Sequence, residues 1–121
     1  MAKTALVVDD SLTFRQMVAL ALADAQFAVL EAGNGQEGLD RLAGTRADII
    51  ISDVNMPVMD GLTFVKHVRA LPQFKSTPIL MLTTESQAEM KQRGKAAGAT
   101  GWIVKPFKAA QLVQVVRDLL P

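Results

Sequence analysis

Five short apolar runs alternate along this chain with segments of helical spacing, and this alternation limits the folds open to it. The runs cover residues 4–8, 28–32, 48–52, 78–82 and 102–104. The third run is apolar without alternation, as expected of a central strand that is buried on both faces. Strands that alternate with helices predict a parallel sheet with helices on both of its faces. We therefore expect an α/β fold made of five strand and helix units.

The expected helices are marked by caps and apolar stripes. Thr13, with Gln16 three residues later, resembles a capping box for the first helix, which should end near Ala25. Asn34 is a candidate cap for the second helix, and Leu71, which precedes a proline, should end the third. The stripes of the first, third and last helices consist of Phe14, Met17, Val18 and Ala21, of Leu62, Val65 and Val68, and of Leu112, Val115, Val116 and Leu119.

The length and composition narrow the range of possible functions. The 121 residues suit one domain, and we expect residues 1–121 to form it without a second domain. No run is long enough to span a bilayer and no signal peptide is recognisable, which predicts a cytoplasmic protein without membrane insertion. The chain has no cysteine, which excludes thiolate metal sites. His67 is the only histidine, so few ligands or bases are available for a zinc site or a Ser-His pair. The candidate metal ligands that remain are oxygen atoms.

The charges are unevenly distributed, although the net charge is +1. Residues 1–60 contain 4 basic and 9 acidic side chains, whereas residues 61–121 contain 9 basic and 3 acidic ones. Because no basic tract is present, we expect no nucleic-acid partner. Lys91, Arg93 and Lys95 lie in a polar helix expected at 86–97 and form a candidate docking edge, although such a run is more often a solvated face.

Polar residues follow four of the apolar runs at the point where each run ends. They are Asp9 and Asp10, Asp53, Thr83 and Lys105. Taken singly, each has an ordinary explanation, such as an aspartate that caps a helix. The carboxyl ends of parallel strands, however, share one edge of the sheet, which is where ligands bind in open α/β folds. We therefore expect three carboxylates, a hydroxyl and an ammonium to converge on one site.

Three neighbouring carboxylates predict a particular chemistry. They repel one another, so the cluster favours a hard divalent cation such as Mg²⁺, which takes oxygen ligands and often binds beside phosphate. Lys105 and Thr83 are suited to neutralise the oxygens of a phosphoryl group in transfer. Asp53 is then the candidate nucleophile, and its product is an aspartyl phosphate.

Four segments carry a resemblance that covers the whole chain. LVVDD, IIISDVNMPVMDG, MLTTE and GWIVKPF resemble the receiver domain of two-component response regulators. With Asn55 two residues after Asp53 and Glu85 two residues after Thr83, the chain is most similar to the single-domain chemotaxis regulators of the CheY type. The resemblance implies a flavodoxin-like (βα)5 three-layer fold, with a parallel five-stranded sheet of order 2-1-3-4-5.

The resemblance also implies a role for each candidate site residue. Asp53 would accept a phosphoryl group from the phosphohistidine of a kinase. Mg²⁺ would be bound by Asp10, by Asp53 and by the backbone carbonyl of Asn55, with Asp9 acting through a metal-bound water. The implied phosphoryl-binding and switch residues are Lys105, in cis linkage to Pro106, Thr83, which closes onto the phosphoryl group, and the aromatic residue at position 102, which rotates inward.

The switch position departs from the family pattern. Family members usually have Tyr or Phe where this chain has Trp102, and often a small residue where it has Thr84. The larger ring and the branched neighbour should narrow the inward path. We therefore expect Trp102 to stay partly outward. His67, on a polar stripe of the third helix, is assigned no function.

A stand-alone response regulator is the function that these features favour. Its expected partners are a CheA-like histidine kinase and a target such as a flagellar motor switch protein, with a phosphatase as a further candidate, and the expected state is a monomer. The expected output surface comprises the fourth helix, the fifth strand and the fifth helix. A phosphorelay intermediate or a phosphate sink would use the same residues.

Two other classes fit the same residues less well. A flavin carrier is disfavoured because Asp9 and Asp10 would repel the flavin phosphate. A true aspartyl phosphatase is disfavoured because Asn55 stands where such enzymes place a general acid. We therefore expect no enzyme acting on free substrates, but a phosphoacceptor that catalyses its own phosphorylation and its own slow dephosphorylation.

Overall fold

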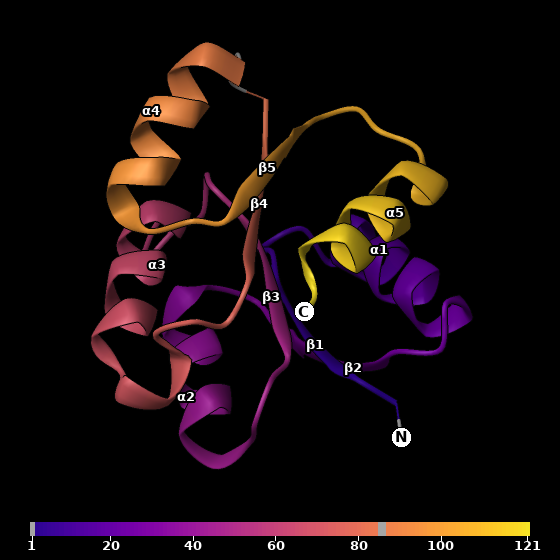
Figure 1. Ribbon diagram of the computed structural model, residues 1–121, viewed down its shortest axis with the longest axis horizontal. Coiled ribbons are helices and arrows are strands. Elements are labelled where there is room, and N and C mark those ends of the chain that lie inside the picture. Colours follow the sequence, from indigo (N-terminus) through magenta and orange to yellow (C-terminus); the bar gives the residue numbers. More distant parts are fainter. Residues whose placement is uncertain (1, 85–86) are drawn as a thin grey trace.

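The computed structural model describes residues 2–84 and 87–121, which form three layers with a twisted sheet in the middle (Figure 1). All strand pairs are parallel and their order is β2-β1-β3-β4-β5, as the resemblance implied. The strands are β1 (Thr4–Val8), β2 (Ala28–Ala32), β3 (Ile49–Asp53), β4 (Ile79–Thr83) and β5 (Gly101–Val104). The third and fourth strands begin and end one residue later than predicted, a difference within the usual uncertainty of strand ends.

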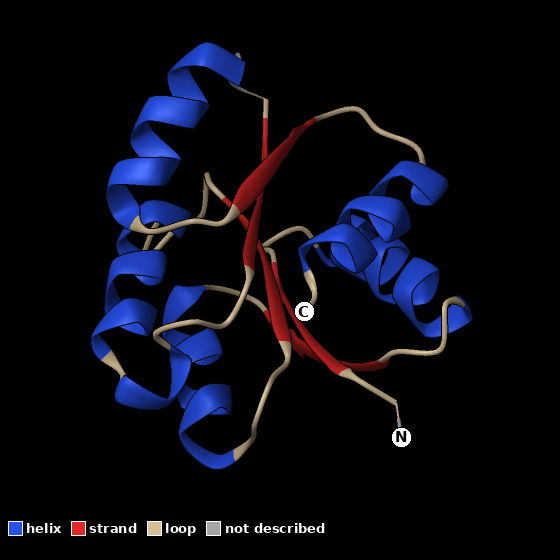
Figure 2. Cartoon of the chain, viewed as in Figure 1, coloured by secondary structure: helices blue, strands red, loops and turns tan. Residues whose placement is uncertain are grey.

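Helices cover both faces of the sheet, as Figure 2 shows. The helices α2, α3 and α4 lie on one face, and α1 and α5 lie on the other. Their bounds are α1 (Leu12–Asp24), α2 (Gly35–Gly44), α3 (Gly61–Ala70), α4 (Gln87–Ala97) and α5 (Ala109–Leu119), with a short 3₁₀ helix, η1 (Pro72–Phe74), after α3. Within the described residues, no helix is both long and apolar enough to cross a membrane.

The sheet separates two hydrophobic cores. Alternate residues of each strand point to opposite faces, so Leu6 and Ile50 pack under α2, α3 and α4, while Val7 and Ile51 pack under α1 and α5. All five residues of β3 are buried, as expected of a central strand in a parallel sheet. The strands are thus held rigidly from both sides, and their carboxyl ends form a firm base for a site.

The start of α1 differs from the prediction. The helix is capped by Ser11, whose hydroxyl accepts a hydrogen bond from the backbone N–H of Phe14 at 3.3 Å, and Thr13 lies inside the first turn. Met17 is 51% exposed, because the buried stripe of α1 runs through Val18 and Leu22. The predicted cap of α2 is confirmed, since Asn34 accepts a hydrogen bond from the N–H of Glu37.

Candidate functional site

Three carboxylates meet at the carboxyl edge of the sheet. Asp9 and Asp10 follow β1, and Asp53 is the last residue of the neighbouring strand β3. Each offers one oxygen to a group whose oxygens all lie within 4.8 Å of one another. Asp9 and Asp53 are buried, with 1% and 7% exposure, whereas Asp10 is exposed. Two carboxylates of the cluster are therefore buried in the protein, and the third is reachable from solvent.

Asp9 is held from three sides. Its N–H donates to the carbonyl of Ala32 on β2, its carbonyl accepts from Nη1 of Arg15 at 2.9 Å, and its Oδ1 accepts from the N–H of Ser11 at 2.9 Å. The second oxygen, Oδ2, is buried and has no hydrogen-bond partner among the described residues. Buried oxygens rarely remain unsatisfied. A cation, or a water bound to one, would satisfy this oxygen.

Lys105 provides the positive charge at the cluster. Its Nζ lies 3.1 Å from Oδ1 of Asp53 and 3.9 Å from Oδ2 of Asp9. One ammonium cannot balance three carboxylates, so the ionised site keeps an excess of negative charge. Hard divalent cations prefer oxygen ligands of this kind, and the donor set therefore fits Mg²⁺.

The surroundings of Asp9 disfavour its charged form. Burial raises the pKa of Asp9, and the nearby charges of Asp53 and Asp10 raise it further, while the Ser11 hydrogen bond and Lys105 act in the opposite direction. Ionised Asp9 therefore costs folding free energy in the metal-free protein. Because its folded pKa lies above its unfolded value of 3.8, this cost appears as the pH rises above about 4.

Replacing Asp9 with asparagine should stabilise the metal-free protein at neutral pH. We expect a gain of about 1 kcal/mol near pH 7, because the amide removes a buried charge, and little gain near pH 4. Mg²⁺ should stabilise the wild type more than the variant. Urea unfolding followed by the fluorescence of Trp102, with and without Mg²⁺, measures both effects. A gain that is equal at both pH values would contradict the assignment to the Asp9 charge.

The position of Lys105 is set by the loop that follows β5. Its N–H donates to the carbonyl of Thr83 at 2.7 Å, and its peptide bond to Pro106 is cis, as the resemblance implied. The ammonium also lies over the ring of Phe14, 4.1 Å from the ring centroid. Phe107 meets that ring edge-on, with centroids 5.8 Å apart. The lysine is thus in contact with a strand end, two acids and an aromatic ring.

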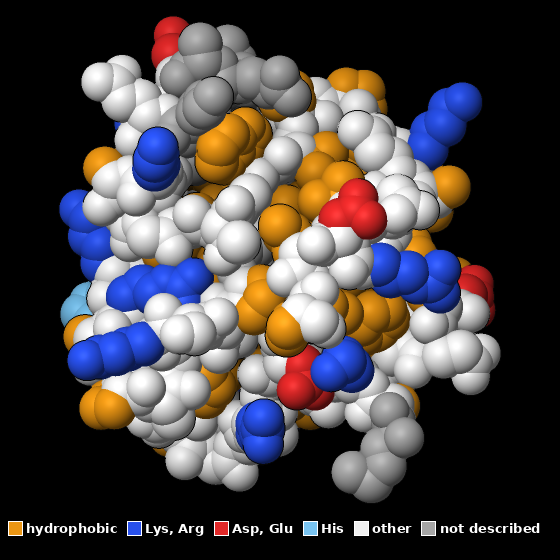
Figure 3. Space-filling model, in the orientation of Figure 1, with side chains coloured by type: hydrophobic (Ala, Val, Ile, Leu, Met, Phe, Trp, Pro, Cys, Tyr) orange, Lys and Arg blue, Asp and Glu red, His pale blue; other side chains and the backbone are white. Residues whose placement is uncertain are grey.

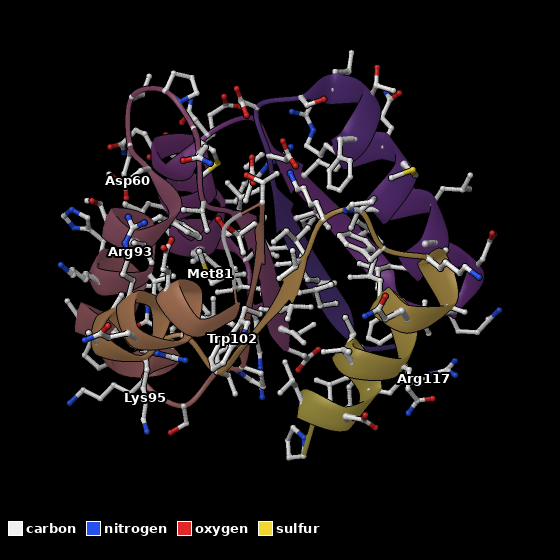
Figure 4. The ribbon with its side chains drawn as sticks, turned by 90° about the horizontal axis from the view of Figure 1, so that it is seen from above. Asp60, Met81, Arg93, Lys95, Trp102 and Arg117 are labelled. Carbon is white, nitrogen blue, oxygen red and sulfur yellow. The ribbon has the colours of Figure 1, made fainter. Side chains whose placement is uncertain are left out.

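The other predicted switch residues lie at the ends of β4 and β5. Thr83 is fully buried at the end of β4, opposite Val104, and Thr84 is exposed. Glu85 lies outside the described residues. Trp102 is half-buried and packs with Met81 against the core under α2, α3 and α4 (Figure 4). Its partly outward position on phosphorylation stays a prediction.

The loop after β3 brings the backbone close to Asp53. The N–H of Val54 donates to Oδ1 of Asp53 at 3.0 Å, and the N–H of Gly61 donates to the carbonyl of Val54 at 2.8 Å. Asn55 is exposed two residues after Asp53. Asp60 caps α3 by accepting from the N–H of Thr63. The loop therefore starts at Asp53, and its last residues bring the start of α3 back to the end of β3.

Some candidate residues lie away from this cluster. His67 is exposed in the last turn of α3. Arg93 and Lys95 are exposed on α4 (Figure 4), and the side chain of Lys91 is outside the described part of the chain. Two contacts of the site were not predicted, those made by Phe14 and Arg15. Neither was visible beforehand, because an apolar residue and an arginine at helix positions look ordinary in a sequence.

The chain matches known proteins over almost its whole length. A family model described as the response regulator receiver domain matches residues 5–117. The chemotaxis protein CheY-3 of Vibrio cholerae is 40% identical over 108 residues, which cover 88% of this chain and 83% of that protein. The sensor histidine kinase CheAY of Helicobacter pylori is 38% identical over 114 residues, which cover 93% of this chain but only 14% of the kinase.

A solved structure agrees with these sequence matches. The chemotaxis response regulator CheY4 of Vibrio cholerae has a TM-score of 0.95 and 52% sequence identity, and the alignment covers 99% of this chain and 100% of that one. The sheet order, the acidic cluster and the lysine after β5 are thus found in a chain whose sequence and fold both match one family. This protein belongs to the response regulator receiver domain family.

Proposed function

We propose that the protein accepts a phosphoryl group on Asp53, with Mg²⁺ bound at the acidic cluster. The observation that carries this proposal is the ion pair between Lys105 and Asp53 beside the buried Oδ2 of Asp9, which has no hydrogen-bond partner in the part of the chain that the structure describes. The carboxylate of Asp53 is oriented by two donors on Oδ1, the N–H of Val54 and the ammonium of Lys105. A group that is oriented in this way needs little rearrangement before it reacts.

The proposed reaction is transfer of a phosphoryl group between two covalent partners. An oxygen of Asp53 forms a bond to phosphorus while the bond from phosphorus to a histidine nitrogen of the donor breaks, and that nitrogen keeps the bonding electron pair. Lys105 moves from the carboxylate to an oxygen of the arriving group, and the hydroxyl of Thr83 donates a hydrogen bond to another. Asp10, Asp53 and the carbonyl of Asn55 would hold Mg²⁺, with Asp9 acting through a water, and the bound cation would supply further neutralising charge.

We infer that the output is a change in the surface formed by α4, β5 and α5. Figure 3 views this face, on which hydrophobic side chains gather over β5 between the two helices. Trp102 on β5 and Val115 and Leu119 on α5 are partly exposed, and apolar surface of this kind is suited to contact with another protein. Thr83, Trp102 and Lys105 all lie on β4 and β5 or directly after them. An event at Asp53 can therefore shift the population of two conformations that a partner distinguishes.

The relatives suggest the setting of this activity. CheY-3 and CheY4 are chemotaxis proteins, and CheAY is a sensor histidine kinase with a segment similar to this chain. We propose a cytoplasmic monomer that receives its phosphoryl group from a CheA-like histidine kinase and acts on a protein target such as a flagellar motor switch protein. Asn55, in place of an acid, agrees with slow dephosphorylation rather than turnover of free substrates.

Intact mass after incubation with acetyl phosphate tests the proposed chemistry. We expect the wild type to gain the mass of one phosphoryl group in the presence of Mg²⁺ and not in its absence. Asp53→Asn should gain none, because the amide lacks the nucleophilic oxygen anion. If a folded wild type that binds Mg²⁺ gained no mass from acetyl phosphate or from a histidine kinase, the proposal would be wrong.

A further inference from the structure

We propose that Phe14 is a positioning residue for Lys105, with Phe107 as its support. The inference rests on the proposed function, because it concerns the lysine that would meet the phosphoryl group. It assigns to an apolar position of α1 the task of keeping the ammonium beside Asp53. Phe14 acts through Lys105 and does not itself contact the reacting atoms.

The first observation is the contact between the ammonium and the ring face. The Nζ of Lys105 lies 4.1 Å from the centroid of Phe14, well within the distance at which an aromatic ring attracts a cation. Phe14 belongs to the first turn of α1, whereas Lys105 directly follows β5. The contact therefore joins two elements that are distant in sequence, and it does so on the face of the sheet that α1 and α5 cover.

The second observation is that the ring is itself fixed. Phe107 meets Phe14 at 80°, with centroids 5.8 Å apart, which is the edge-to-face arrangement that aromatic pairs favour. Both rings are partly buried and pack against the core under α1 and α5. Since Phe107 lies two residues after Lys105, one loop carries both the lysine and the ring that supports its aromatic partner.

The third observation concerns the freedom of the lysine. The side chain of Lys105 is 20% exposed. It is long and flexible, and moving into solvent would increase its conformational entropy. The Phe14 ring opposes this movement because it attracts the ammonium and because it blocks part of the path to solvent. The ring does not, however, form a strong hydrogen bond with the ammonium. The ammonium therefore stays at the cluster, and its N–H groups can change their hydrogen-bond acceptor from Asp53 to a phosphoryl oxygen.

Ring-current shifts in the metal-free, unphosphorylated protein test the contact directly. In the wild type, the ε-methylene protons of Lys105 should resonate upfield of those of solvent-exposed lysines, because they lie near the Phe14 face. The shift should be lost in Phe14→Leu, kept in Phe14→Tyr, and unchanged in Met17→Leu, a control at an exposed position on the same helix. A wild-type Lys105 with the shifts of an exposed lysine would overturn the proposal.

Binding of beryllium trifluoride, which mimics a phosphoryl group on a carboxylate, tests the consequence. We expect Phe14→Leu to weaken this binding about 3- to 10-fold, the range that a cation–π contact supports, while the affinity for Mg²⁺ is unchanged and Phe14→Tyr restores binding. Equal losses for both ligands, or no loss at all in Phe14→Leu, would overturn the positioning role. If the wild type bound no beryllium trifluoride and gained no phosphoryl group, the proposed function would fail, while the ring-current result would still decide whether Phe14 holds Lys105.

Discussion

Gly61→Ala is expected to destabilise the protein by about 3 kcal/mol and to slow phosphorylation of Asp53 more than about tenfold. A Cβ at Gly61 would overlap the carbonyl oxygen of Asp53 and would lie 2.9 Å from the Cα of Val54. Both neighbours are backbone atoms, so no side chain can move aside. Either the start of α3 or the end of β3 has to shift, and the end of β3 carries Asp53, the proposed phosphoacceptor.

Gly44 provides the matched control for this substitution. It is the last residue of α2, and a Cβ added there would meet no atom within 4 Å. Gly44→Ala should therefore be neutral or slightly stabilising, because alanine favours a helix more than glycine does. Urea unfolding and the rate of mass gain from acetyl phosphate measure both effects. Equal stability and equal rates for the two variants would show that the approach of Gly61 to Asp53 is unimportant.

Arg69→Met is expected to destabilise the protein by about 3 kcal/mol and to lower Tm by about 10 °C, without reducing Mg²⁺ affinity. The guanidinium donates to the carbonyls of Gly98, Phe74 and Thr77 at 2.9, 2.7 and 2.7 Å, and to Oγ1 of Thr100 at 3.3 Å. Burial lowers the pKa of Arg69, which reflects the partial loss of its hydration. Methionine fills similar space but leaves these acceptors without their donor.

The expected effect of Arg69→Met is specific to its network. Arg69 joins the end of α3 to η1 and to the turn between α4 and β5. These contacts lie near the amino ends of β4 and β5, whereas the acidic cluster lies at the carboxyl ends of the strands. Lys66→Met, at an exposed position of the same helix, removes an equal charge and should change Tm by no more than a few degrees. Thermal unfolding and calorimetric Mg²⁺ titration compare the variants. Similar Tm values for the two would contradict a structural role for the network.

The sequence predicted the fold well because its signals are local. The five apolar runs, the cap at Asn34 and the end of α3 at Leu71 each depend on residues near one another in the chain. The cap of α1 was placed at Thr13 rather than Ser11, because both residues are good caps and only the path of the chain after Asp10 distinguishes them.

The site was predictable only in part. Asp9, Asp10, Asp53 and Lys105 come together as expected, since a parallel sheet aligns its carboxyl ends. The contacts that orient them were not visible in the sequence. Arg15 on the carbonyl of Asp9 and Phe14 under Lys105 depend on how α1 packs against β1 and β5. The spacing of residues along one helix or strand does not predict a contact between two different elements.

The two edges of the sheet have a consequence for how this protein meets other chains. At one edge, β5 has only four residues, and at the other, β2 carries Glu31, whose carboxylate pairs with Arg15 at 3.0 Å. Short strands and charged side chains at sheet edges oppose the pairing of one chain's backbone with another's. The partly exposed side chains of β5 can therefore lie at the surface without inviting fibrous aggregation, and at the proposed output surface side-chain contacts, rather than backbone pairing, would decide which partner binds.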